Sequence, residues 1–137
     1  MVERDKRMDM NCFSVRNRIR CEAVNGFNHR LDSWSSSDWM TAVVGELGEA
    51  ANLVKKLNRV RDGIPGNTED AVALRAKLAH ELADTYIYLD LLCQSLGVSL
   101  ADSVLEKFEI SSKKIGYVEH GCEWCNQVGT NCHCGAR

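Results

Sequence analysis

Apolar side chains recur at spacings of three, four and seven positions along most of this chain, which is the spacing of one face of an α-helix. One stripe repeats at every fourth position: Val15, Ile19, Ala23, Phe27 and Leu31. The longest stripe contains Leu74, Leu78, Leu82, Leu89, Leu92 and Leu96. The pattern predicts four helices, over about residues 14–31, 37–61, 68–96 and 99–115. The sequence therefore predicts an all-α fold.

Residues that favour helix starts support these boundaries. Ser14, the serines at 35–37 and Thr68 stand where N-capping hydroxyls are expected. Ser99-x-x-Asp102 resembles a capping box for the fourth helix.

Two flanking segments lack the helical periodicity. Residues 1–13 alternate in charge and are expected to form a flexible arm. Residues 117–137 are rich in cysteine and are expected to form a separate tail. The predicted helical domain is therefore the segment 14–116.

Composition describes an ordinary globular protein of one domain. The chain has 137 residues, of which 45% are hydrophobic and 26% are charged, and its net charge is −2. This charge gives no case for a nucleic-acid or membrane partner, and no apolar run approaches the length of a membrane span. The charged start of the chain does not resemble a signal peptide. Seven cysteines without such a signal indicate a reducing compartment, the cytoplasm.

Two pairs of acids interrupt the apolar stripes of the second and third helices. Glu46 and Glu49 form the first pair, and Glu81 and Asp84 form the second. Both pairs have i, i+3 spacing, so the members of each share a helix face. The two pairs are related by reflection about Pro65, the only proline, which lies in the turn-like segment 62–67. An antiparallel hairpin about that turn would bring all four carboxylates to the same level along the axes of the two helices.

Four carboxylates in a partly dry site require a cation, and hard oxygen ligands suit Mg²⁺ or Mn²⁺. Since Mg²⁺ held by carboxylates usually completes its shell with water and substrate phosphates, the pattern favours a metal site that acts on a phosphate-bearing substrate. The alternative is a set of solvated acids on two outer helix faces. The mirrored register of the two pairs favours the metal site.

The local sequence around the acids resembles that of the all-α nucleoside triphosphate pyrophosphohydrolases, the MazG and dimeric dUTPase-like superfamily. Residues 45–52 with Lys55 and Lys56 look like the first metal-binding helix of that family, and residues 81–84 with 86–89 look like the second. The similarity covers about residues 14–116. It implies a four-helix MazG-like bundle that hydrolyses (deoxy)nucleoside triphosphates to monophosphate and pyrophosphate with Mg²⁺, for cleansing or adjusting nucleotide pools.

The same resemblance implies a role for each acid and an oligomeric state for the protein. Glu46, Glu49, Glu81 and Asp84 would hold the metal, and Glu49 would also orient or deprotonate the attacking water. A homodimer or tetramer is expected, because one chain offers too little surface to bury both sides of the helices. A different metal-dependent phosphohydrolase on the same bundle remains an alternative.

Four further side chains are candidates for substrate binding. Trp39 shares a face with Glu46 and lies two turns, about 10 Å, away, so it could stack on a base or else belong to the core. Lys56 lies seven residues after Glu49 on the same face and could contact phosphate. Lys107 and Lys114 lie in a stretch similar to one in phage-type members of the family, although Glu109 replaces a frequent asparagine there. They are either phosphate ligands or solvated lysines. If Trp39 is core, the base is expected at Phe27, His29 or Trp34.

The tail contains four closely spaced thiols: Cys122, Cys125, Cys132 and Cys134. Four such ligands suit a tetrahedral structural Zn²⁺, although a disordered tail with free thiols is an equal alternative. This tail supports the alternative function, a non-enzymatic helical dimer with a zinc knuckle for nucleic acid. Trp124 lies inside the knuckle but Arg137 is the only arginine nearby, so no nucleic-acid partner is expected.

Overall fold

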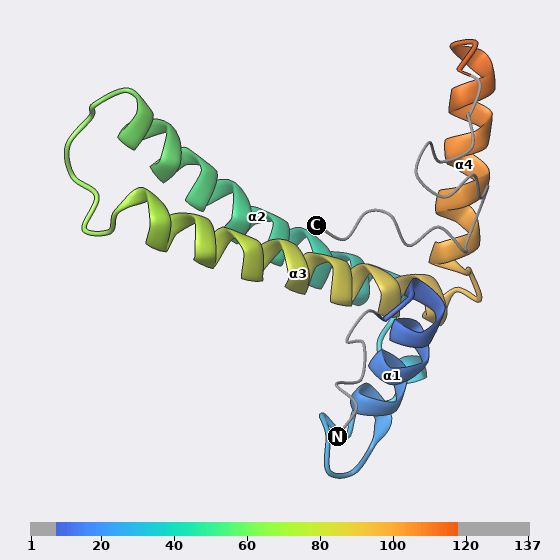
Figure 1. Ribbon diagram of the computed structural model, residues 1–137. Coiled ribbons are helices and arrows are strands. Elements are labelled where there is room, and N and C mark those ends of the chain that lie inside the picture. Colours follow the sequence, from blue (N-terminus) through green and yellow to red (C-terminus); the bar gives the residue numbers. More distant parts are fainter. Residues whose placement is uncertain (1–7, 118–137) are drawn as a thin grey trace, which may run out of the picture. The chain divides into compact units, whose positions relative to one another are not determined.

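The computed structural model describes residues 8–117, and every regular element within that range is a helix. The elements are α1 (Met10–Glu22), a 3₁₀ turn η1 (Leu31–Ser33), α2 (Ser36–Arg61), α3 (Ala71–Ser95) and α4 (Leu100–Lys114), as shown in Figure 1. The all-α prediction is confirmed for these residues. The chain falls into two compact units that divide between Ala101 and Asp102, and each unit is described by itself.

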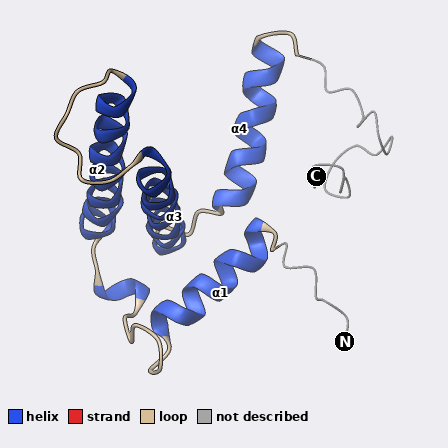
Figure 2. Ribbon diagram, turned by 60° about the vertical axis from the view of Figure 1, so that its left-hand side comes forward, coloured by secondary structure: helices blue, strands red, loops and turns tan. Residues whose placement is uncertain are grey.

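Helices α2 and α3 lie side by side and antiparallel, and they form the main body of the first unit (Figures 1 and 2). The connection contains Pro65 and two glycines with positive φ, Gly63 at 66° and Gly66 at 110°. Arg59 donates to the Pro65 carbonyl, and Asn67 Nδ2 donates to the Lys56 carbonyl at 2.8 Å. The predicted hairpin about Pro65 is therefore present in the described fold.

The two long helices begin at polar caps. At the start of α2, the Ser35 hydroxyl accepts from the Asp38 amide at 3.3 Å, and Asp38 accepts from the Ser35 amide at 2.9 Å. This reciprocal pair is a capping box, and it satisfies two backbone donors that the helix itself leaves unpaired. At the start of α3, Asp70 accepts from the Ala73 amide at 2.8 Å. The expected cap at Thr68 was therefore two residues too early.

The first helix differs most from its prediction. It begins at Met10, because Asp9 accepts from the Cys12 amide at 2.7 Å and provides the cap expected from Ser14. Residues 10–13 are therefore helical, although they were expected to belong to the flexible arm. The helix ends at Glu22, nine residues before the predicted end.

A tight turn explains the early end of α1. After Ala23 the backbone folds back, and the amide of Phe27 donates to the Arg20 carbonyl at 3.0 Å. A Cβ at Gly26 would lie 2.0 Å from that same carbonyl oxygen, so only glycine fits there. The turn separates Phe27 and Leu31 from the α1 stripe, which leaves Val15, Ile19 and Phe27 exposed.

The core lies where α1, η1, α2 and α3 meet. Its buried side chains are Cys21, Leu31, Trp39, Val43, Leu91 and Leu92, with Tyr88 and Leu89 packed against them. The Trp39 indole donates to the Leu31 carbonyl at 3.1 Å, so the buried ring also satisfies its polar atom. Of the predicted leucine stripe of α3, Leu74 and Leu92 are buried, whereas Leu82 and Leu96 are exposed.

A buried carboxylate joins α1 to α3. Asp90 is only 1% exposed and accepts from Asn17 Nδ2 at 2.9 Å and from Gln94 Nε2 at 2.8 Å. The Ser14 hydroxyl also donates to Asp90. Ser14 therefore helps to fix α1 on α3, since its hydroxyl is not used as a helix cap.

Several apolar or small positions face open space. On α2, a Cβ at Gly45 or at Gly48 would meet nothing within 4 Å, so no close approach within the described chain explains these glycines. On α4, the apolar side chains of Val104, Leu105 and Phe108 are exposed. Taken one at a time, the described helices include none that is long and apolar enough to span a membrane.

Candidate metal and substrate site

Three of the four predicted acids lie together on the hairpin. One carboxylate oxygen each from Glu46, Glu81 and Asp84 lies within 4.8 Å of the others. Glu46 comes from α2, and the other two come from consecutive turns of α3. Their convergence follows from the mirrored spacing, because antiparallel helices that pair about Pro65 place position 46 opposite position 84.

Glu49 lies outside this group of three and is exposed. The negative charge of Glu49 nevertheless acts on Glu46, a member of the group. Burial raises the pKa of Glu46 above its ordinary value, and the negative charges of Asp84, Glu49 and Glu81 raise it further. Glu46 is therefore the carboxylate on which the charges of the other three act together.

The donor set of this cluster fits a hard divalent cation. All three groups are carboxylates, and oxygen ligands of this kind are preferred by Mg²⁺ and Mn²⁺ rather than by zinc. Like charges that gather in a partly buried position also repel one another, and a bound cation would relieve that repulsion. Residues Glu46, Glu81 and Asp84 would hold such an ion.

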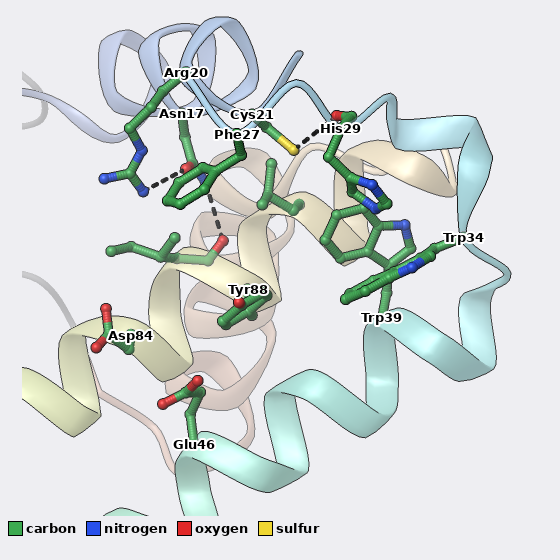
Figure 3. A pocket seen from close by; sticks show the side chains of 12 residues that line it. Asn17, Arg20, Cys21, Phe27, His29, Trp34, Trp39, Glu46, Asp84 and Tyr88 are labelled. Carbon is green, nitrogen blue, oxygen red and sulfur yellow. Dashed lines mark hydrogen bonds between the residues drawn. The ribbon is translucent and has the colours of Figure 1, made fainter. Parts of the chain in front are cut away.

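A cavity of about 430 Å³ extends from Glu46 and Asp84 toward the aromatic core. Figure 3 shows Glu46 and Asp84 at one end, on facing helices, and Trp34, Trp39 and His29 at the other. Tyr88, four residues after Asp84 on α3, lies between the two ends (Figure 3). The cavity therefore offers carboxylates at one end and flat aromatic rings at the other.

The aromatic end is a cluster of three rings. His29 lies 4.7 Å from Trp34 and 5.4 Å from Trp39, and the two indoles are 4.7 Å apart, measured between ring centroids. Trp39 is 1% exposed, whereas Trp34 is 39% exposed. Trp39 thus lines the cavity as a core residue, and Trp34 has more surface free to meet a ligand.

The predicted phosphate contact Lys56 does not line this cavity. Lys56 borders a separate hollow of about 120 Å³ at the hairpin turn, together with Asn67 and Thr68. Lys107 and Lys114 are exposed on α4, in the second unit. The four cysteines of the proposed zinc site, Cys122, Cys125, Cys132 and Cys134, lie outside the described residues.

The sequence reasoning missed two polar residues that line the cavity, Asn17 and Arg20, both on α1. The available signal was the spacing, because Asn17, Arg20 and Cys21 are neighbours on one helical face. The apolar spacing of Val15 and Ile19 instead predicts that their side of the helix is buried, whereas both side chains are exposed.

Comparison of the chain with protein-family models, with curated proteins and with solved structures finds no match. The site is therefore interpreted from its own chemistry.

Proposed function

We propose that this protein hydrolyses (deoxy)nucleoside triphosphates to nucleoside monophosphate and pyrophosphate in a Mg²⁺-dependent reaction. One observation carries the proposal. Two members of the carboxylate cluster, Glu46 and Asp84, and a cluster of three aromatic rings border the same cavity. Carboxylates that hold Mg²⁺ suit phosphates, and aromatic faces suit a nucleobase, so a nucleotide matches both ends.

The size of the cavity agrees with such a ligand. Sites for small organic molecules and cofactors typically occupy about 300–1,000 Å³ and combine apolar walls with a few polar groups. The cavity has about 430 Å³ and contains both kinds of lining. The base would lie against Trp34 and His29, with the phosphates directed toward Glu46 and Asp84.

Within this proposal, Mg²⁺ held by Glu46, Glu81 and Asp84 would neutralise charge on the phosphates and lower the pKa of a bound water. Glu49 is exposed beside the cluster, and its carboxylate would accept the proton from the attacking water. The water oxygen would bond to the α-phosphorus as the bond to the bridging oxygen breaks. Pyrophosphate would then leave. Removal of unwanted nucleotides, or adjustment of a nucleotide pool, is the role that this chemistry would serve.

The test is a screen of the common ribo- and deoxyribonucleoside triphosphates with Mg²⁺, in which pyrophosphate and inorganic phosphate are measured separately. We expect monophosphate and pyrophosphate in equal amounts, and no turnover when the divalent cation is chelated. Release of inorganic phosphate alone would instead support a different phosphohydrolase on the same hairpin. If no nucleotide is turned over with Mg²⁺ or Mn²⁺, the proposed function is wrong.

A further inference from the structure

The charge around the cavity is unbalanced if the ligand is a triphosphate. Three carboxylates already surround the place where the metal would bind, so in their ionised form they more than offset the charge of one divalent cation before any phosphate arrives. A triphosphate adds several further negative charges. Lys56, the predicted phosphate contact, borders a different hollow. Another cation is therefore needed at the cavity itself.

Among the described residues that line this cavity, Arg20 is the one lysine or arginine, and Figure 3 shows its guanidinium on the side where Asp84 lies. Its partners are neutral. One of its terminal nitrogens donates to Asn17 Oδ1 at 3.4 Å, and its guanidinium carbon lies 5.3 Å from the centroid of the Phe27 ring. In the described part of the chain, no carboxylate lies within ion-pair distance of Arg20.

Two nearby arginines, Arg18 and Arg30, are arranged differently, whereas Arg16 donates to the sulfur of Met8. Arg18 pairs with Glu22 at 3.1 Å, and Arg30 pairs with Asp32 at 2.7 Å. Each of these charges is offset by a carboxylate on the same stretch of chain. Within residues 8–117, no carboxylate offsets the charge of Arg20, which can therefore meet an anion in the cavity.

The neutral partner of Arg20 is itself held in place. Asn17 is 3% exposed, and its Nδ2 donates to the Ile87 carbonyl at 3.0 Å and to Asp90 Oδ2 at 2.9 Å. These two acceptors use both amide hydrogens, so the amide cannot flip and Oδ1 must face Arg20. Ile87 and Asp90 belong to α3, the helix that also carries Asp84. Arg20 is thus tied to the helix that supplies two of the clustered acids.

We propose that Arg20 binds a phosphate oxygen of the substrate, and that Asn17 and Asp90 are positioning residues that hold its guanidinium at the cavity. This inference rests on the proposed function. An arginine suits the task because its planar group forms paired hydrogen bonds to phosphate oxygens and keeps its charge at any physiological pH. The weak 3.4 Å bond to Asn17 leaves the other guanidinium hydrogens available to that phosphate.

The test compares two ligands in the full-length protein. One is a non-hydrolysable α,β-methylene nucleoside triphosphate with Mg²⁺, and the other is the corresponding nucleoside without phosphates. Arg20→Gln should weaken the affinity for the triphosphate analogue about ten-fold or more, because a charge-assisted hydrogen bond is lost. Its affinity for the nucleoside should change less than two-fold. Arg18→Gln, an exposed arginine on the same helix, is the matched control and should change neither affinity.

The positioning role is tested by a double-mutant cycle. Asn17→Ser removes the amide oxygen that accepts from Arg20. The effect of Asn17→Ser on the affinity for the triphosphate should largely disappear in the Arg20→Gln background. Arg20→Lys should restore only part of the affinity, since it keeps the charge but loses the planar fork. Additive effects of Asn17→Ser and Arg20→Gln would overturn the positioning role.

The outcomes separate this inference from the proposed function. If the wild-type protein binds the analogue and Arg20→Gln binds it equally well, Arg20 is not a phosphate ligand, while the proposed function stands. If Arg20→Gln weakens binding of the nucleoside as much as that of the triphosphate, Arg20 only shapes the cavity and the inference fails. If the wild-type protein binds neither ligand, the proposed function and this inference fail together.

Discussion

At the scale of single residues, substitution of a clustered acid should have the largest effect on the rate of hydrolysis. Asp84→Asn keeps the size of the side chain but removes one negative charge from the cluster of Glu46, Glu81 and Asp84. A catalytic metal contributes several kcal/mol to the stabilisation of the transition state, so we expect kcat/KM to fall about 100-fold or more. Circular dichroism should show unchanged helix content. Glu106→Gln, an exposed acid on α4, is the control and should leave the rate unchanged.

Substitutions of the two tryptophans should have different effects, one on the stability of the fold and the other on substrate binding. Trp39 is 1% exposed, so Trp39→Ala should lower the free energy of unfolding by about 3–5 kcal/mol, measured by chemical denaturation. Trp34 is 39% exposed at the mouth of the cavity, so Trp34→Ala should cost little stability. Its loss should instead raise KM about ten-fold, in line with about 1–3 kcal/mol for stacking of a base on an aromatic ring. A KM that changes only in Trp39→Ala would contradict this assignment.

Lys56 shows why a shared helix face does not establish a shared site. Positions seven apart lie on one side of a helix but about 10 Å apart along its axis. From Glu49, that distance leads toward the hairpin turn, where Lys56 borders the smaller hollow with Asn67. The cavity extends in the opposite direction, toward Trp39.

At the scale of the elements, the start of α2 should be sensitive to pH. Hydrogen bonds from the Ser35 hydroxyl and the Ser35 amide lower the pKa of Asp38 below its ordinary value. A carboxylate with a lowered folded pKa stabilises the folded state above the ordinary aspartate pKa of about 3.9, and this contribution is lost as the pH falls through the folded value. Asp38→Asn should therefore lower the melting temperature at pH 7.

The same variant should behave differently in acid. As the pH falls through the lowered pKa of folded Asp38, this carboxyl group becomes neutral in the wild-type protein as well, so the difference between the two melting temperatures should narrow. Thermal melts at several pH values between neutrality and about pH 3 would measure it. A difference that stays constant over this range would show that the charge of Asp38 does not stabilise α2.

The first helix shows how a periodic pattern can extend past an element. Val15, Ile19, Ala23, Phe27 and Leu31 continue at every fourth position, yet the helix ends at Glu22. The turn at Gly26 reverses the chain, and Leu31 then enters the core from the 3₁₀ segment. Burial of Leu31 against Trp39 and Cys21 outweighs the local preference for a longer helix.

At the scale of the whole molecule, an apolar stripe on α2 offers a surface on which the prediction of self-association can be tested. Met40, Val44, Leu47 and Val54 lie at helical spacing, and each is at least 42% exposed. Gly45 and Gly48 have open space in the same stretch of helix, which would allow a second helix to approach closely. Exposed apolar patches of this kind mark protein interfaces. The homodimer or tetramer remains a prediction.

Leu47→Glu tests that prediction, because a charge in the middle of the stripe would be desolvated in a helix-to-helix interface. We expect the wild-type protein to sediment as a dimer or tetramer at micromolar concentration and the variant to sediment as a monomer. Val72→Glu, at a position that is 74% exposed outside the stripe, is the matched control and should associate like the wild type. A monomeric wild-type protein would contradict the prediction.

The sequence by itself determined the helical class, the hairpin about Pro65 and the convergence of the acids. These features depend on periodicity and on spacing along two helices, and both can be read directly from residue positions. Tertiary structure decided that Glu49 stands apart from the other three acids, that Trp39 is buried and that Arg20 lines the cavity. The burial of Trp39 and the position of Arg20 depend on the turn at Gly26 and on the buried hydrogen bonds of Asp90. These features place η1 and α1 through contacts between residues far apart in the chain.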